Sequence, residues 1–244
     1  MSTAAIPRQE VRAAPRIPPL QAGDRLTRGE FERRYRAMPH IHKAELVEGV
    51  VYMPSPVSNE GHASPHLQLT TLFGTYWSQT PGVQCGDNGT LLLDWDNEPQ
   101  PDAFVRILPQ YGGQSGDRDD YVAGAPELVA EVAASSASYD LHDKLRAYRR
   151  NGVCEYLVWR VWDREIDWFV LRAGAYERLD RGADGLYHSE VFPGLWLDAA
   201  ALIGGDLAQA IRAVQQGLAS VEHAAFVARL QQIPSPNPTP AAQP

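Results

Sequence analysis

The chain has 244 residues, of which 44% are hydrophobic and 21% are charged, a composition that excludes a disordered or fibrous protein. Twenty-two basic residues against thirty acidic ones give a formal net charge of −8, so no global positive field draws the protein onto nucleic acid, and a polyanion has to be bound locally. The sequence has no run near the roughly 18 to 20 apolar residues that cross a bilayer and no apolar signal core at its start, so we expect a cytoplasmic protein without membrane contact.

Both ends of the chain are predicted to be disordered tails. Residues 1–23 are rich in Ala, Pro and Arg, and residues 233–244 alternate Pro with small polar residues. Neither segment can bury enough apolar surface to order itself. We therefore expect one domain over residues 24–203, followed by a C-terminal helix within residues 204–232.

The first predicted elements are a short helix and a hairpin. The helix begins at Thr27, because Thr27 and Glu30 have the spacing of a capping box, and it ends near Pro39. Residues 45–56, with the sequence ELVEGVVYMPSP, predict two short strands that turn at the Glu-Gly pair 48–49.

The rest of the chain predicts a helix, strands, a second helix and further strands. Beyond residue 59 four apolar side chains share one helical stripe, and the runs TLLLDW, DAFVRIL and ELVAEVA then predict three strands. A helix is expected from about residue 139 to 151. After it, EYLVWRV, EIDWFVL, AYERL and LYHSEVF predict antiparallel strands, and an Ala-rich amphipathic helix is expected from about residue 206 to 230. The stripe consists of Leu69, Leu72, Phe73 and Tyr76.

Two carboxylates in this pattern point to chemistry. Asp102 opens one predicted strand and Glu131 lies inside the apolar run LVAEVA of another, so the two can converge if the strands are neighbours. An ionised carboxylate inside an apolar run is costly unless a cation, a metal or hydrogen bonds compensate it. Lys144 follows on the next predicted helix, one turn after Asp140, and can direct its ammonium group into the same pocket.

Such a pocket fits a hard divalent cation. Two carboxylates, waters and a backbone carbonyl are the ligands that Mg²⁺ prefers, with Mn²⁺ as a substitute. The ion polarises a scissile phosphate and lowers the pKa of a bound water, while Lys144 orients the attacking water or offsets charge on the phosphoryl oxygens. The residues therefore predict metal-assisted hydrolysis of a phosphodiester.

The order Pro101-Asp102, Glu131-Val132-Ala133 and a displaced Lys144 resembles the PD-(D/E)XK nuclease superfamily. From about residue 30 to 203 the chain resembles, more specifically, the Uma-type putative restriction endonuclease family. This resemblance implies an α/β (α+β) fold of the restriction-endonuclease-like type, with a mixed β-sheet flanked by helices and additional antiparallel strands after the active-site helix. It also implies a Mg²⁺-dependent endonuclease that hydrolyses nucleic acid, with DNA as the expected substrate.

The resemblance assigns roles to individual residues. Asp102 and Glu131 would be metal ligands, Lys144 the catalytic lysine, and Glu45 the upstream acid, although Glu48 is an alternative for that last role. Three further side chains are expected near the site: Tyr148 packs behind the lysine, His62 lines the cleft or caps a helix, and Arg146 contacts a nucleic-acid backbone.

Two departures from the family pattern support a second hypothesis. Ala133 stands where the E-x-K triplet has lysine, and the loop Ala134–Ala137 lacks the proline and two hydroxyls common in the family. These changes favour a catalytically weak or inactive nuclease fold that serves as a nucleic-acid-binding or protein-interaction module. A carboxylate-pair glycosidase is disfavoured, because Lys144 would keep both acids ionised. A homodimer is a further hypothesis, since cutting both strands of a duplex needs two sites.

Overall fold

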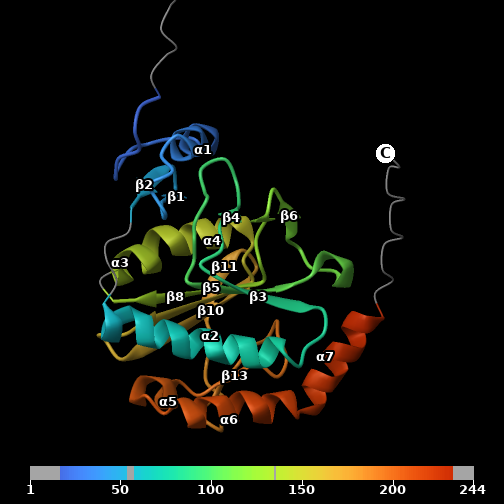
Figure 1. The fold of residues 1–244 in the computed structure, drawn as a ribbon. Coiled ribbons are helices and arrows are strands. Elements are labelled where there is room, and N and C mark those ends of the chain that lie inside the picture. The colour runs from blue at the N-terminus through green and yellow to red at the C-terminus, as the bar shows by residue number, and fades with distance from the viewer. Residues whose placement is uncertain (1–16, 54–57, 135, 233–244) are drawn as a thin grey trace, which may run out of the picture.

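The computed structural model describes residues 17–53, 58–134 and 136–232. Residues 1–16 and 233–244 of the expected tails, residues 54–56 of the hairpin segment, and Ser135 of the Ala134–Ala137 loop lie outside the described residues. Figure 1 shows a central sheet with α2 and the C-terminal helices on one face, α4 on the other, and a small N-terminal lobe above α4. In the part of the chain that is described, no helix has the length and apolarity needed to cross a bilayer.

The central sheet has six strands in the order β11-β10-β9-β8-β5-β3. Strands β8 and β9 are parallel, and the other neighbouring pairs are antiparallel. This arrangement confirms the predicted mixed sheet flanked by helices and the antiparallel strands that follow the active-site helix. The strands are β3 (Val83–Asp87), β5 (Ala103–Ile107), β8 (Leu128–Ala133), β9 (Glu155–Arg160), β10 (Glu165–Arg172) and β11 (Ala175–Arg178).

Helices cover both faces of this sheet. Every residue of β8 is buried, as expected for a central strand whose two faces are covered, and its run LVAEVA does not show the polar alternation of a half-exposed strand. The predicted stripe of α2 is confirmed, because its four apolar side chains are all buried in the core on one face. The helices of that face are α2 (Ser64–Trp77), α5 (Ala199–Gly204), α6 (Leu207–Leu218) and α7 (Val221–Gln231).

The opposite face is covered by the helix predicted over residues 139–151, which contains a widened turn. Its first part is α3 (Ala137–Tyr139), followed by the π-helical turn η3 (Asp140–Lys144) and by α4 (Leu145–Asn151). The helix ends at Gly152, which adopts a left-handed conformation with φ 83°. A second π-helical turn, η1 (Asn59–Ala63), leads into α2.

The N-terminal lobe consists of α1 (Arg28–Arg36) and the hairpin of β1 (Glu45–Val47) with β2 (Val50–Tyr52). The hairpin turn is confirmed: Glu48 and Gly49 both have positive φ, 52° and 72°, as a two-residue turn that follows the strand twist requires. The lobe has its own small core, and the sequence before α1 contributes to it. Its buried members are Leu20, Phe31, Ala44, Leu46 and Val51.

The capping box expected at the start of α1 is not formed. Thr27 is the N-cap residue but makes no side-chain capping bond, and Glu30 instead accepts hydrogen bonds from Arg33 and Arg34. The charge-assisted bonds to two arginines outcompete a single bond to a backbone N–H.

The segment predicted as one helix over residues 206–230 forms two helices. The extended residue Ser220 interrupts it, and its hydroxyl caps α7 by accepting from the N–H of His223. The predicted strand LYHSEVF is also shorter than expected, because β12 (Tyr187–His188) pairs only with β13 (Trp196–Leu197). The remaining elements are β4 (Leu91–Leu92), β6 (Gly116–Arg118), β7 (Tyr121–Ala123) and the 3-10 turn η2 (Pro109–Tyr111).

Candidate active site

Two adjacent strands bring the predicted carboxylates together. Strands β5 and β8 are antiparallel neighbours with Ala103 opposite Ala130, so Asp102 and Glu131 lie beside each other at the end of the pair. One oxygen of Asp102, Oδ2, accepts a hydrogen bond of 2.7 Å from the backbone N–H of Val132. This bond fixes the aspartate against β8 and leaves its other oxygen available.

Lys144 lies at the centre of the site. Its Nζ is 2.8 Å from Oε1 of Glu131, 3.1 Å from Oε1 of Glu45 and 3.9 Å from Oδ1 of Asp140. The lysine is only 4% exposed and the three acids are also buried. A buried ion pair needs such further partners, because the charges have lost their hydration. The backbone N–H of Gln100 adds a 2.7 Å hydrogen bond to Glu45.

The π-helical turn η3 positions the lysine. A π turn carries one extra residue and widens the helix locally, and such turns are frequent at functional sites. Asp140 opens the turn and Lys144 closes it, with both side chains directed inward. The hydroxyl of Tyr156 donates to the backbone carbonyl of Asp140 at 3.1 Å and ties the turn to β9. The ring of Tyr139 lies 5.4 Å from the ammonium nitrogen, close enough for a cation–π contact.

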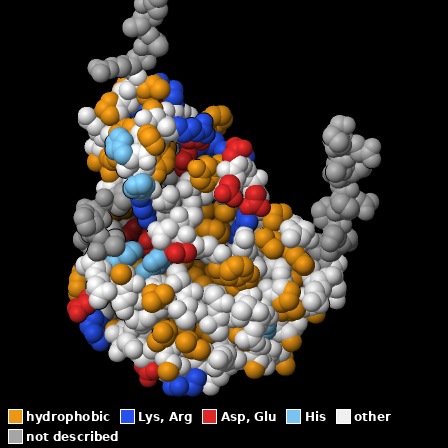
Figure 2. All heavy atoms as spheres, viewed as in Figure 1, with side chains coloured by type: hydrophobic (Ala, Val, Ile, Leu, Met, Phe, Trp, Pro, Cys, Tyr) orange, Lys and Arg blue, Asp and Glu red, His pale blue; other side chains and the backbone are white. Residues whose placement is uncertain are grey.

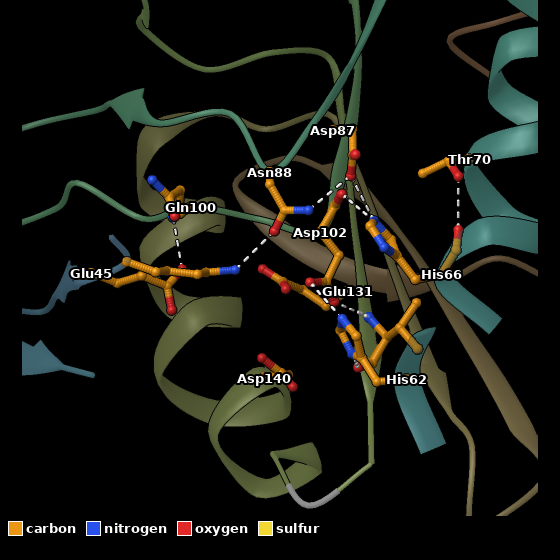
Figure 3. Close-up of polar contacts among 12 residues, drawn as sticks. Glu45, His62, His66, Thr70, Asp87, Asn88, Gln100, Asp102, Glu131 and Asp140 are labelled. Atoms are coloured by element: carbon orange, nitrogen blue, oxygen red, sulfur yellow. Dashed lines mark hydrogen bonds and ion pairs between the residues drawn. The ribbon is translucent and has the colours of Figure 1, made fainter. Parts of the chain in front are cut away.

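The site holds more negative than positive charge. Four carboxylates are buried here, three of them paired with one lysine and the fourth beside Glu131, and Figure 3 shows the four acidic side chains close together. Burial raises the pKa of Glu131 well above its usual value, with Lys144 opposing the shift, and burial also raises the pKa of Asp140. Burial alone would lower the pKa of Lys144, but Glu131 and Glu45 outweigh it, so the lysine stays protonated. The carboxylates are Glu45, Asp102, Glu131 and Asp140.

Tyr148 was expected behind the lysine and contacts the glutamate directly. Its hydroxyl donates to Oε1 of Glu131 at 3.0 Å, the oxygen that also accepts from Lys144. Two donors therefore hold Oε1, and the orientation of this carboxylate leaves Oε2 free of both. Tyr148 is completely buried, so its contribution is to orient Glu131 and not to meet a substrate.

His62 lies on η1, close to both Val132 and Asp102. Its Nδ1–H donates to the carbonyl of Val132 at 3.0 Å, while Nε2 is 3.4 Å from Oδ1 of Asp102. Because a carbonyl only accepts, a neutral imidazole would present its bare Nε2 to the carboxylate. A proton or another cation between the two groups would relieve this repulsion.

A polar rim continues outward from Asp102. His66 Nε2 lies 2.8 Å from both the Asp102 carbonyl and Oδ1 of Asp87, and Asn88 donates to the same Asp87 oxygen at 2.9 Å. Lys43 donates to Asn88 at 3.0 Å. Figure 2 shows acidic, basic and histidine side chains around a recess below the N-terminal lobe. The sequence pattern did not predict a role for Asp87, Asn88 or Lys43 of this rim.

Two of the expected residues lie outside the buried cluster. Glu48 occupies the hairpin turn and pairs with Arg150 at 3.0 Å, whereas Glu45 reaches Lys144; the role of Glu45 as the upstream acid stays a prediction. Arg146 has a side chain that is 54% exposed and bonds to Asp143 at 2.5 Å. Asp140 joins the cluster although the sequence assigned it no role. Its spacing of four residues before Lys144 was the available signal.

The donor set fits a cation that keeps most of its waters. Within the described ranges, no three His, Cys, Asp or Glu side chains come close enough together to hold a metal ion. Mg²⁺ is commonly bound through one or two carboxylates and several waters, and Asp102 and Glu131 each keep one oxygen that the hydrogen bonds above do not use. The site therefore suits Mg²⁺ or Mn²⁺ and does not suit a structural zinc ion with four protein ligands.

Comparisons with known proteins give a family and a fold. The family model described as "Uma2: Putative restriction endonuclease" matches residues 29–200. Among solved structures, the chain is similar to the crystal structure of a putative nuclease belonging to DUF820 from Anabaena variabilis. The TM-score is 0.54 at 14% sequence identity, over 70% of this chain and 96% of that one, a likeness of fold. No curated protein matches the chain.

Proposed function

The chain belongs to the Uma2 family of putative restriction endonucleases, and from this membership and the buried cluster we propose that it is a Mg²⁺-dependent endonuclease that cuts DNA. The observation that carries the proposal is a group of four buried carboxylates, in which three acids contact Lys144 and Asp102 lies beside Glu131. One ammonium group leaves this charge uncompensated, and a divalent cation is the ligand that balances it.

Asp102 and Glu131 would hold the ion, through the oxygens that their hydrogen bonds leave available. When bound, the ion supplies Lewis-acid polarisation of the scissile phosphate. Glu45 would serve mainly to hold Lys144, by its 3.1 Å contact.

Lys144 acts as a fixed positive charge in this mechanism. Because its neighbouring carboxylates raise its pKa, it remains an ammonium group and cannot accept the proton of the attacking water. Instead it donates hydrogen bonds, orienting the water or the phosphate and stabilising the charge that develops on the phosphoryl oxygens. Tyr148 keeps Glu131 in place during this step, and His62 holds Val132 and Asp102 in register.

Cleavage assays test the proposal. Plasmid, linear duplex, single-stranded DNA and RNA are each incubated with Mg²⁺ or Mn²⁺ and with wild type, Lys144→Ala or Glu131→Ala. The matched control is Glu222→Ala, which removes an exposed carboxylate from α7. We expect wild type and Glu222→Ala to cut DNA and the two cluster variants to lose at least about 100-fold in rate. Equal rates for all four proteins would contradict the proposal.

A second candidate function has its own supporting observation. Lys144 is almost fully enclosed and already engaged by carboxylates, and Ala133 leaves the usual lysine position empty of charge. These features favour a catalytically inactive nuclease fold that binds nucleic acid or a protein. Isothermal titration with Mn²⁺ separates the two candidates: an enzyme site binds the ion and loses it in Asp102→Asn, whereas an inactive fold shows no binding that depends on Asp102.

A further inference from the structure

A cavity of about 430 Å³ lies on the face of the central sheet that α2 and α5 cover, opposite the face that carries α4 and Lys144. It opens between η1, the start of α2, the β9–β10 turn and the end of α5, and Figure 1 shows α5 and the start of α2 at the same end of the molecule. Its volume is in the range of pockets that take small ligands. Apolar walls come from Pro65, Trp159 and Leu202, with polar groups at a few positions. This combination is typical of a binding pocket.

Trp162 gives the cavity an exposed aromatic surface. It lies in the turn between β9 and β10, and 61% of the residue is exposed although it borders the cavity. Gly61 of η1 permits its position, because a Cβ atom there would lie 2.8 Å from Cζ2 of the indole. A tryptophan ring held against the backbone, with much of its surface open, is suited to stacking on another flat ring.

Gln68 supplies an unmet hydrogen-bonding group at the same cavity. Within the described part of the chain its Oε1 is enclosed without a hydrogen-bond partner, and its amide nitrogen has only a long contact of 3.4 Å to Ser64. Enclosed polar groups normally have partners, so a ligand that brings both a donor and an acceptor is favoured here. A glutamine amide pairs in this way with N6 and N7 of adenine.

The cavity and the cluster share structural elements. The π-helical turn η1 carries both His62, which lies against Asp102, and Glu60, which borders the cavity. Val132, whose carbonyl contacts His62, is paired in register with Trp159 of the cavity wall. These shared elements place the cavity and the cluster on opposite faces of the sheet.

We propose that this cavity binds an unpaired nucleobase, preferably adenine, stacked on Trp162 and hydrogen-bonded to Gln68. The inference rests on the proposed function because it takes the base to belong to the nucleic acid that the protein binds. The base pocket itself makes a separate prediction, because a free nucleotide should bind without metal and without a cleavable bond. Arg164, exposed at the rim, is positioned to meet the nucleotide's phosphate.

Calorimetric titration of the full chain with AMP in the absence of divalent ions tests the pocket. We expect saturable binding, weakened on the order of 10-fold or more in Trp162→Ala and largely retained in Trp162→Phe, since stacking on an aromatic ring provides this much affinity per base. Trp95→Ala is the matched control, because Trp95 is 80% exposed and lies in the β4–β5 connection, outside the cavity. Ribose 5-phosphate, which lacks the base, should not bind measurably.

Several results would overturn the inference. They are the absence of saturable AMP binding, equal affinities for wild type and Trp162→Ala, or an equal loss in Trp95→Ala. If an apolar peptide displaces a hydrophobic dye from the cavity and AMP does not, the pocket would be assigned to a protein partner instead.

The two proposals can fail separately. If AMP binds through Trp162 but no polynucleotide is cut, the pocket stands and the nuclease proposal fails. If DNA is cut and AMP does not bind, the pocket inference fails alone. Glu131→Gln should bind AMP as wild type does, because Glu131 does not border the cavity.

Discussion

Replacing Lys144 with methionine should destabilise the protein strongly, because it removes the only ammonium group among the buried carboxylates. Methionine has a similar length and no charge. The substitution leaves Glu131, Glu45 and Asp140 without the cation that lies 2.8, 3.1 and 3.9 Å from them. Breaking a buried ion pair by removing one partner typically costs about 3 to 5 kcal/mol, since the remaining charge stays desolvated.

The structure argues for the lower end of that range at neutral pH. Burial already raises the pKa of Glu131, so without the lysine this carboxyl can take up a proton and limit the cost. We therefore expect a loss of about 3 kcal/mol in the free energy of unfolding, measured by urea denaturation at pH 7. For a chain of this length that corresponds to a decrease of roughly 10 °C in Tm.

The double variant Lys144→Met/Glu131→Gln tests the cause of this loss. If the cost comes from the unpaired carboxylate, neutralising Glu131 should recover part of it, with a coupling free energy of about 1 to 3 kcal/mol in a double-mutant cycle. Arg146→Met is the matched control, because its cation is half exposed and paired on the surface, and it should lose less than about 1 kcal/mol. Strictly additive effects of the two cluster substitutions would refute this account of the cluster.

Two further substitutions test buried polar groups, one beside α1 and one in the site. Burial, together with Glu32, raises the pKa of Glu98 from 4.5 to about 8. Between these two pH values the folded state holds a proton that the unfolded state releases. The stability of the protein therefore falls as the pH rises from about 4.5 to 8. The free energy of unfolding of Glu98→Gln should therefore be about 3 kcal/mol greater than that of wild type at pH 7 and nearly the same at pH 4. Urea denaturation measures this difference, with Glu222→Gln as the control. A difference that does not change with pH would contradict the expectation. Tyr148→Phe removes a bond to the carboxylate of Glu131 and should cost about 2 kcal/mol by the same assay, more than Tyr176→Phe, whose hydroxyl donates to the neutral carbonyl of Val153. Equal losses in the two tyrosine variants would show that Glu131 bears no charge at that position.

The sequence predicted the central part of the fold well, because its signals there are strong and local. Alternating or apolar runs marked β5, β8 and β9, and the stripe of α2 followed helical spacing. The predicted helix over residues 206–230 failed at Ser220, where a local cap competes with continued helix. Both possibilities satisfy the same hydrophobic pattern, so periodicity could not decide between them.

The candidate site was only partly predictable, for a physical reason. Asp102, Glu131 and Lys144 could be named because each interrupts or follows an apolar run, and Glu45 came from the family resemblance. Asp140 was named only by its spacing from Lys144, and the rim at Asp87 was not named, since their roles depend on which side chains the η3 turn and the β3–β5 pairing bring together. The π turn itself leaves no recognisable pattern of residue types.

The excess of buried carboxylates also explains why folding and cation binding should be linked in this protein. Four buried acids with one lysine among them oppose folding by mutual repulsion and by lost hydration, so any cation that binds them in the folded state stabilises it. A site built for a structural role would reach neutrality with two ion pairs, or with apolar side chains of similar volume. The excess of negative charge in the site is therefore better explained by reversible binding of a cation than by a contribution to stability. The same reasoning places the lysine in a supporting role: its charge makes the acids tolerable in the absence of the cation without neutralising them.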